Sequence, residues 1–148
     1  MPATPGTTQL YAAGLQKWQR GLLPVTTAGC LKALLVDASY TPNMETHTNL
    51  THITNEVYGD DWPEGGVTLT GVDVTIDTSN DRCQIGFAAI NVTPASVAGG
   101  KRLVIYHALP PADADKTLFA LITFTTALSP VYGSIAIAAP DGMFRTGY

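Results

Sequence analysis

The sequence predicts a mainly β protein, an antiparallel and jelly-roll-like β-sandwich of about seven or eight strands with one short N-terminal helix. The apolar residues change from helical to strand-like spacing after Gly29, and turn signals then recur at intervals typical of sandwiches. Strand-like and helix-like segments do not alternate, which argues against a parallel α/β fold. Because no repeat or linker divides the chain, we expect one domain over residues 9–148.

The N-terminal region predicts an arm followed by the helix. Residues 1–8 are mostly Pro, Thr and Gly, which predicts a flexible or partner-ordered arm. The helix is expected near residues 8–21, where apolar residues recur at helical spacing and form one stripe. The members of this stripe are Tyr11, Leu15, Trp18 and Leu22. Gly21 and Pro24 are expected to end the helix.

The region after Gly29 predicts a series of strands and one long loop. Residues 31–38 form a nearly continuous apolar run, which indicates a central strand buried on both faces. Residues 43–56 show neither helical nor strand-like spacing of apolar residues, so we expect a long loop of the kind that often forms interfaces. Residues 67–77 alternate, and their apolar face switches at Gly71, which predicts a bulge or a bend between sheets.

Further strand-like segments complete the expected sandwich. They are residues 82–87 with a continuation at 90–92, and residues 103–109, 118–126 and 134–138. Apolar residues of these strands are expected in the core or in tight packing between subunits. The set is Leu34, Val36, Leu69, Val104, Tyr106, Leu121, Ile122 and Phe124.

Composition excludes several classes of function. The chain has 148 residues and only eight Lys and Arg, which are scattered, so we expect no nucleic-acid partner. No apolar run approaches the roughly 20 residues that span a bilayer, and the first residues lack a secretory signal, so we expect neither a membrane partner nor export. Charged residues make up 14%, against about 25% in ordinary domains, which indicates either surface covered by neighbouring subunits or a Thr-, Ser- and Asn-rich surface.

The residues that could carry chemistry lack partners at the required spacing. His47 and His52 match no established metal spacing, so we expect solvated loop histidines and no metal. Asp60 and Asp61 predict a solvated acidic turn or a calcium site of loop oxygens, because adjacent carboxylates are not preformed for glycoside hydrolysis. We therefore expect no enzyme activity and no cofactor. Two cysteines, Cys30 and Cys83, are expected to be separate buried thiols rather than a bridge.

Aromatic residues of the helix and the loops are the candidates for an interface. The set is Tyr11, Trp18, Tyr40, Tyr58 and Trp62. For Trp62, which follows two acidic residues in a loop, two interpretations stand equally. The indole ring either lies exposed for a partner or a sugar, or folds back over the end of the sandwich.

The order of the turns and strand starts resembles that of small β-sandwich structural proteins of tailed-phage virions. The resemblance extends over residues 11–148. The segments that carry it are Asp-Ala-Ser-Tyr-Thr-Pro (37–42), Asn-Glu-Val (55–57), Gly-Gly-Val-Thr-Leu-Thr-Gly (65–71), Leu-Val-Ile-Tyr (103–106), Leu-Ile-Thr-Phe (121–124) and Gly-Met-Phe (142–144). Tyr58, Trp62 and the segment 82–84 depart from the usual pattern.

The resemblance implies a head decoration, or cement, protein that bridges and stabilises capsid subunits. It would be made in the host cytoplasm and placed on the capsid exterior. Its implied partners are the major capsid protein and further copies of itself, with a trimer as the expected homo-oligomer. The alternative is a tail or receptor-binding component that presents residues 43–64 to a host glycan. The motifs are structural and transfer no catalytic residues.

Overall fold

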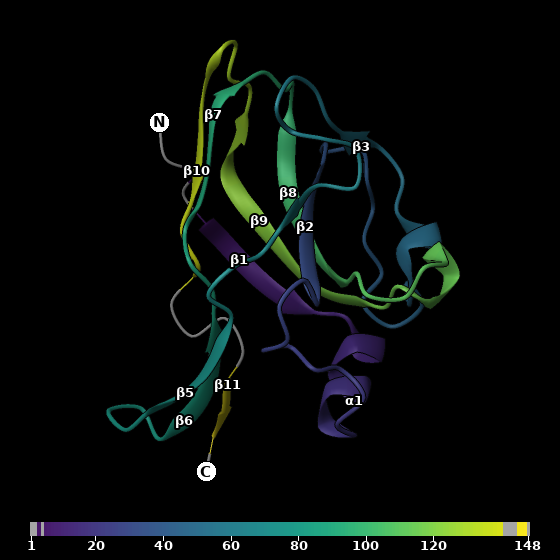
Figure 1. Cartoon of the computed structure of the whole chain (residues 1–148), viewed down its shortest axis with the longest axis vertical. Helices are drawn as coiled ribbons and strands as arrows, with labels where there is room; N and C mark the ends of the chain where they lie inside the picture. Colours follow the sequence, from purple (N-terminus) through teal and green to yellow (C-terminus); the bar gives the residue numbers. More distant parts are fainter. Residues whose placement is uncertain (1–2, 4, 141–144, 148) are drawn as a thin grey trace.

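The computed structural model describes residues 3, 5–140 and 145–147 and shows several antiparallel sheets packed together with one α-helix (Figure 1). The large sheet has the order β1-β9-β8-β2-β3, and β4 pairs with β2 beside β3. Its strands are β1 (Pro5–Leu10), β2 (Leu31–Val36), β3 (Glu56–Val57), β4 (Val67–Thr68), β8 (Gly100–His107) and β9 (Leu118–Leu128). The predicted mainly β fold with a short helix is confirmed.

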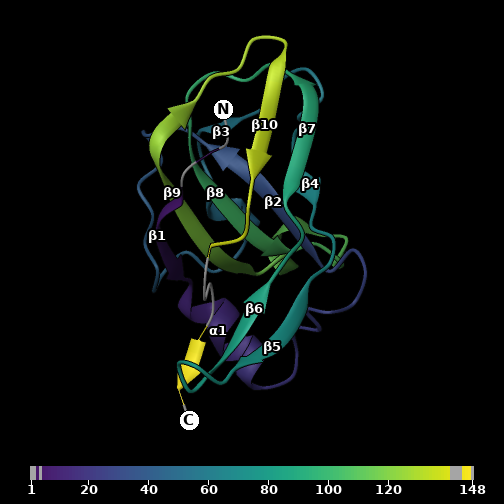
Figure 2. The same ribbon diagram turned by 90° about the vertical axis from the view of Figure 1, so that its left-hand side faces the viewer.

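The second layer consists of two smaller sheets, one that lies over the large sheet and one that extends past its lower end (Figure 2). One pairs β7 (Ile90–Ala95) with β10 (Gly133–Ile137), and the other has the order β11-β6-β5. The strands of this three-stranded sheet are β5 (Asp73–Asp77), β6 (Arg82–Gly86) and β11 (Arg145–Gly147). The chain passes from the large sheet to the three-stranded sheet between β4 and β5 at Gly71, whose φ is +60°, so the predicted bend between sheets is confirmed.

The large sheet is buried on both faces, which explains the continuous apolar run of β2. Ala33 and Leu35 face the main core, which the second layer closes, whereas Leu34 and Val36 face a second, smaller core. Residues 40–53 cover this second core and contain the short 3-10 helix η1 (Leu50–His52). η1 contacts a second short 3-10 helix, η2 (Asp113–Asp115), which lies between β8 and β9. All eight side chains predicted for the core are buried.

Residues 5–8 belong to the sheet, so the predicted flexible arm over residues 1–8 is wrong for them. β1 pairs antiparallel with β9, with Gln9 opposite Leu121, and the backbone N–H of Ala3 donates to Ala136 O of β10 (2.8 Å). The sequence signal was missing because Leu10 is the only large apolar residue in 5–10, so the segment shows no apolar alternation. Residues 1, 2 and 4 of the predicted arm lie outside the described residues.

Helix α1 (Ala12–Gln19) is shorter than the predicted span of 8–21. Its start is displaced because β1 uses the backbone up to Leu10, and Tyr11 forms the N-cap position. Trp18 packs against Phe119 of β9, with ring centroids 6.4 Å apart. Leu22, predicted for the same stripe, lies past the helix end and is exposed.

Candidate interaction surfaces

The hairpin of β5 and β6 extends beyond the large sheet at the lower end of the molecule (Figures 1 and 2). In its three-stranded sheet β6 is central and β5 is an edge strand. Every residue of β5 from Asp73 to Ile76 is exposed, in contrast to the buried strands of the large sheet. An exposed edge strand presents backbone N–H and C=O groups that can pair with another chain. The lower end therefore offers backbone as well as side chains to a partner.

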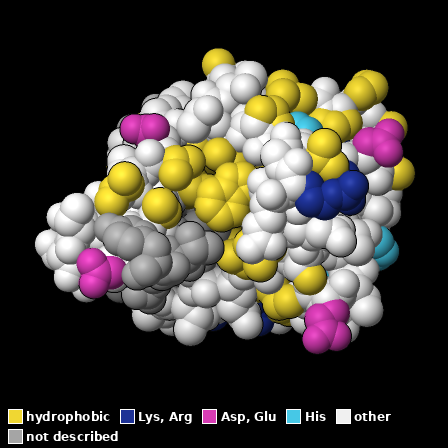
Figure 3. Space-filling view, turned by 90° about the horizontal axis from the view of Figure 1, so that it is seen from below, with side chains coloured by type: hydrophobic (Ala, Val, Ile, Leu, Met, Phe, Trp, Pro, Cys, Tyr) yellow, Lys and Arg dark blue, Asp and Glu magenta, His cyan; other side chains and the backbone are white. Residues whose placement is uncertain are grey.

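One face of this hairpin is apolar, and we call it the hairpin face: Val74, Ile76, Cys83 and Ile85. Residues directly opposite each other in an antiparallel pair project to the same face, and Val74 lies opposite Ile85 while Ile76 lies opposite Cys83. Ile85 is buried in the main core, but Val74 is 40% exposed and Ile76 is 67% exposed. The apolar surface thus continues from the core outward to the hairpin tip. Seen from below, hydrophobic side chains gather across the middle of this end, with acidic side chains toward its rim (Figure 3).

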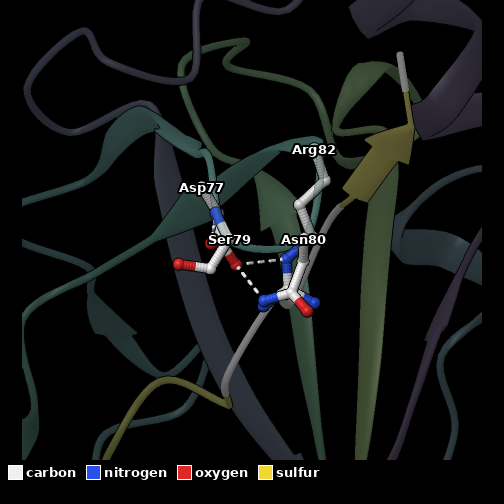
Figure 4. A network of polar contacts seen from close by, with 4 residues as sticks. All are labelled: Asp77, Ser79, Asn80 and Arg82. Atoms are coloured by element: carbon white, nitrogen blue, oxygen red, sulfur yellow. Dashed lines mark hydrogen bonds and ion pairs between the residues drawn. The ribbon is translucent and has the colours of Figure 1, made fainter.

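The turn that joins β5 to β6 is held by one carboxylate (Figure 4). Asp77 Oδ1 accepts from the backbone N–H of Ser79 (3.1 Å), and Oδ2 accepts from Asn80 Nδ2 (2.8 Å) and Arg82 Nε (2.7 Å). These partners, Asn80 foremost, hold the pKa of Asp77 below its usual value. A turn with four fixed polar groups loses little conformational entropy when a partner binds the hairpin.

A second exposed apolar group lies at the upper end, and we call it the end patch: Tyr58, Val131 and Tyr132. These side chains are 56%, 79% and 76% exposed. Their loops meet at Ser96, whose Oγ accepts from Tyr132 N (2.9 Å) and whose N–H donates to Asp60 O (3.1 Å). The connection from β9 to β10, which carries Val131 and Tyr132, lies at the opposite end of the long axis from the hairpin (Figure 1).

A polar pocket of about 450 Å³ lies at the edge of the large sheet. Its lining includes the apolar residues Leu50 and Ile53 and the charged residues Lys32, Glu56, Glu64, Asp113 and Lys116. Asp113 and Lys116 form an ion pair at 2.8 Å. The pocket therefore combines two apolar side chains with several hydrogen-bonding ones.

Two residues brace the pocket wall at Gly65. Glu56 Oε1 accepts from Gly65 N (2.5 Å), and Tyr106 OH donates to Gly65 O (2.6 Å). Burial raises the pKa of Glu56 in spite of that hydrogen bond. Burial and the nearby carboxylates of Glu56 and Asp113 raise the pKa of Tyr106 to about 12. Both side chains therefore support the loop, and sequence analysis missed them because the contact joins distant strands.

The structure corrects most of the predicted interface residues. Tyr11, Tyr40 and Trp62 are buried within the chain, at 0%, 1% and 0% exposure, so they stabilise its own core and the prediction is wrong for them. The interpretation of Trp62 as a ring folded over the sandwich end is the correct one. Trp18 is half-buried against the sheet, and only Tyr58 of the five candidates is exposed. The burial of these rings could not be predicted because the sequence does not show which segments fold back over the sandwich.

Cys30 and Cys83 are free thiols, which confirms the expectation of separate cysteines. Burial raises the pKa of Cys30 to about 11, so its thiol is protonated at neutral pH. Within residues 3, 5–140 and 145–147, no group of three or more His, Cys, Asp or Glu could hold a metal ion. In the same part of the chain, no helix is long and apolar enough to cross a membrane.

Comparisons of this chain with protein-family models, curated proteins and solved structures found no match. Large apolar side chains are exposed at both ends of the molecule, and exposed apolar side chains that form a contiguous patch mark interaction sites.

Proposed function

We propose that this chain is a structural protein of a phage virion, acting as a head decoration protein that bridges neighbouring coat subunits. The observation that supports this is the placement of the hairpin face and the end patch at opposite ends of one sandwich. A protein with one such surface can bind a partner, whereas a protein with two separated surfaces can join two partners. Whatever binds the assembled shell more tightly than free coat protein stabilises the shell by mass action.

In this proposal the hairpin takes the place of the N-terminal arm as the contacting element. Residues 5–10 are already paired with β9, so their backbone groups are not available along that side for a neighbour. The hairpin combines an exposed edge, an uncovered apolar face and a turn fixed by Asp77. The self-association that we propose, with a trimer as the expected form, is tested by light scattering of the purified protein.

A charge on the hairpin face should remove the protein from phage heads. We expect Ile76→Asp to reduce occupancy on heads stripped of the native protein about tenfold or more, because it places a carboxylate in an apolar contact. The matched control is Thr75→Asp, which adds the same charge to the other face of the same strand and should bind normally. Tyr132→Asn tests the end patch in the same assay, with Asn chosen because Tyr132 has a φ of +48°.

Occupancy is measured by sedimentation and washing, followed by heating of the particles to release the genome. Equal retention of Ile76→Asp and Thr75→Asp would remove the hairpin face from the proposal. If the unaltered chain binds tails or host cells instead of heads, the head role is wrong. Copy number in purified particles gives an independent check, since a decoration protein is present in hundreds of copies and a tail protein in few.

The polar pocket supports a second candidate function, a tail or receptor-binding component that takes a host glycan. Leu50, Ile53, Glu56 and Glu64 all belong to the region 43–64 that this alternative assigns to the ligand. A lining that mixes apolar side chains with charged hydrogen-bonding ones suits the faces and hydroxyl groups of a sugar. Binding of a bacterial surface glycan that is lost in Glu64→Gln, with no binding to heads, would favour this function.

A further inference from the structure

The segment 40–53, which we call the cover loop, closes one face of the large sheet. Tyr40, Met44, Leu50 and Ile53 pack on the second core. Backbone hydrogen bonds fasten the loop at its edges, from Ala12 N to Met44 O (2.8 Å), from Leu118 N to Thr48 O (3.1 Å) and from Leu50 N to Lys116 O (3.0 Å). Removing the loop would expose a buried apolar surface.

Two histidines of the cover loop, His47 and His52, accept backbone hydrogen bonds through Nδ1. His47 Nδ1 lies 3.4 Å from Asn43 N. His52 Nδ1 lies 3.3 Å from Thr48 N and 3.4 Å from Asn49 N, and closes the capping box of η1. A backbone N–H can only donate, so each Nδ1 must carry a lone pair. Both rings are therefore neutral, with their proton on Nε2.

The same reasoning gives a direction to the hydrogen bonds below His47. Tyr40 OH lies 2.8 Å from His47 Nδ1 and must donate to it, and Tyr11 OH, 3.0 Å from Tyr40 OH, must then donate to Tyr40. Both tyrosines are buried, which leaves their hydroxyls few other partners. The loop is thus connected to the sheet through a relay that requires an unprotonated Nδ1 on His47.

The surroundings do not favour a charged ring. His47 and His52 stack with ring centroids 5.5 Å apart and planes 7° from parallel, so two imidazolium rings would repel each other. The charged groups around them are Arg102, whose Nη1 donates to Tyr40 O (2.9 Å), Lys17, which donates to Thr117 Oγ1, the Asp113–Lys116 ion pair, and the exposed Glu45. In the described part of the chain, no carboxylate is hydrogen-bonded to either histidine ring.

We propose that His47 and His52 make the cover loop an acid-released clamp, held on the sheet at neutral pH and loosened when both rings take up a proton at Nδ1. Protonation converts each Nδ1 from an acceptor into a donor that faces other donors. It breaks the capping box, reverses the relay from Tyr11 and Tyr40, and places two like charges in a stack. The loop then separates from the second core while the main core stays closed.

The sign of the pH dependence follows from burial. The pKa of His47 lies below its ordinary value because burial disfavours the charged ring and His52 repels it. The unfolded or opened chain therefore binds the proton more readily than the closed chain. The stability contributed by the clamp is complete above about pH 6.5 and is lost as the pH falls below that value.

Hydrogen exchange at pH 7.5 and pH 5.0 tests this directly, after correction for the intrinsic exchange rate. We expect the protection of amides in residues 40–53 to be lost at pH 5.0 and to be complete at pH 7.5. The hairpin segment 73–86, which contains no histidine, should keep its protection. In His47→Asn/His52→Asn, whose amide oxygens accept without titrating, the fall should disappear.

The third histidine supplies the matched control, since His107→Gln should leave the acid response intact. An equal fall in the His47→Asn/His52→Asn chain, or a parallel fall in the hairpin, would overturn the proposal. Should that variant fail to fold, the imidazole proton resonances of the unaltered chain decide. Loop amides must then change in the same pH range in which His47 and His52 titrate, and opening in another range would also overturn it.

Discussion

Replacing Gly66 with alanine should destabilise the protein by about 4 kcal/mol or more, enough to prevent folding of a marginal domain. Gly66 has a φ of +78°, and a Cβ built on it would lie 1.8 Å from Ala33 O in β2. That carbonyl belongs to the central strand, which is packed on both faces and cannot move aside. The backbone of residues 65–67 must therefore withdraw, and the pairing of Val67 with Ala33 would be lost.

Gly99→Ala is the matched control for this prediction. Gly99 has a nearly equal φ of +76°, but no heavy atom lies within 4 Å of its built Cβ. Gly99→Ala should lower the free energy of unfolding by only about 1–2 kcal/mol, the energy of holding an alanine in the left-handed region of backbone conformation. Urea unfolding monitored by tryptophan fluorescence measures both. Similar losses for the two variants would show that close approach to Ala33 is not what requires glycine at residue 66.

Truncation of Trp62 should produce the second large loss. The side chain is 0% exposed and belongs to the main core. It does so although it lies on a loop, between the exposed residues Asp61 and Pro63. Trp62→Ala should reduce the free energy of unfolding by about 3–5 kcal/mol through lost burial and the cavity left behind. Differential scanning calorimetry should show a correspondingly lower Tm.

Trp62→Phe separates ring burial from hydrogen bonding. The indole Nε1 of Trp62 is buried and has no hydrogen-bond partner among the described residues. A phenylalanine keeps an aromatic ring and removes that unpaired donor, so we expect a loss of less than about 1.5 kcal/mol. If Trp62→Phe were as destabilising as Trp62→Ala, the indole N–H would have to be bonded in solution.

Much of the fold could be predicted because local patterns report it. Alternation and turn residues located seven strand regions, and the run at 31–38 indicated a strand covered on both sides. The short strands β3 and β11 were missed because a strand of two or three residues is too short to show a period. By contrast, the expected change of sheet at Gly71 is present, with β4 before it in the large sheet and β5 after it in the three-stranded sheet. Each of these elements could be predicted because the apolar pattern within about ten consecutive residues is enough to indicate it.

The candidate surfaces were harder to predict. The sequence placed Val74 and Ile76 on one face of a strand but could not show that their side chains are 40% and 67% exposed. Conversely, Tyr11 and Tyr40 were expected at an interface, whereas they are buried under the cover loop and joined by one hydrogen bond, although 29 positions separate them in sequence. Exposure depends on which distant segment lies above a side chain, and local pattern does not encode that.

By itself, the sequence determined the β class of this protein, its short helix, its core residues and its separate cysteines. These follow from apolar periodicity, turn chemistry and composition, which act locally. Only the tertiary structure decided that residues 5–10 pair with β9, that Trp62 is internal, and that apolar side chains remain at two opposite ends. The physical reason is that pairing and burial depend on contacts between segments far apart in the chain, where many local patterns are compatible with more than one partner.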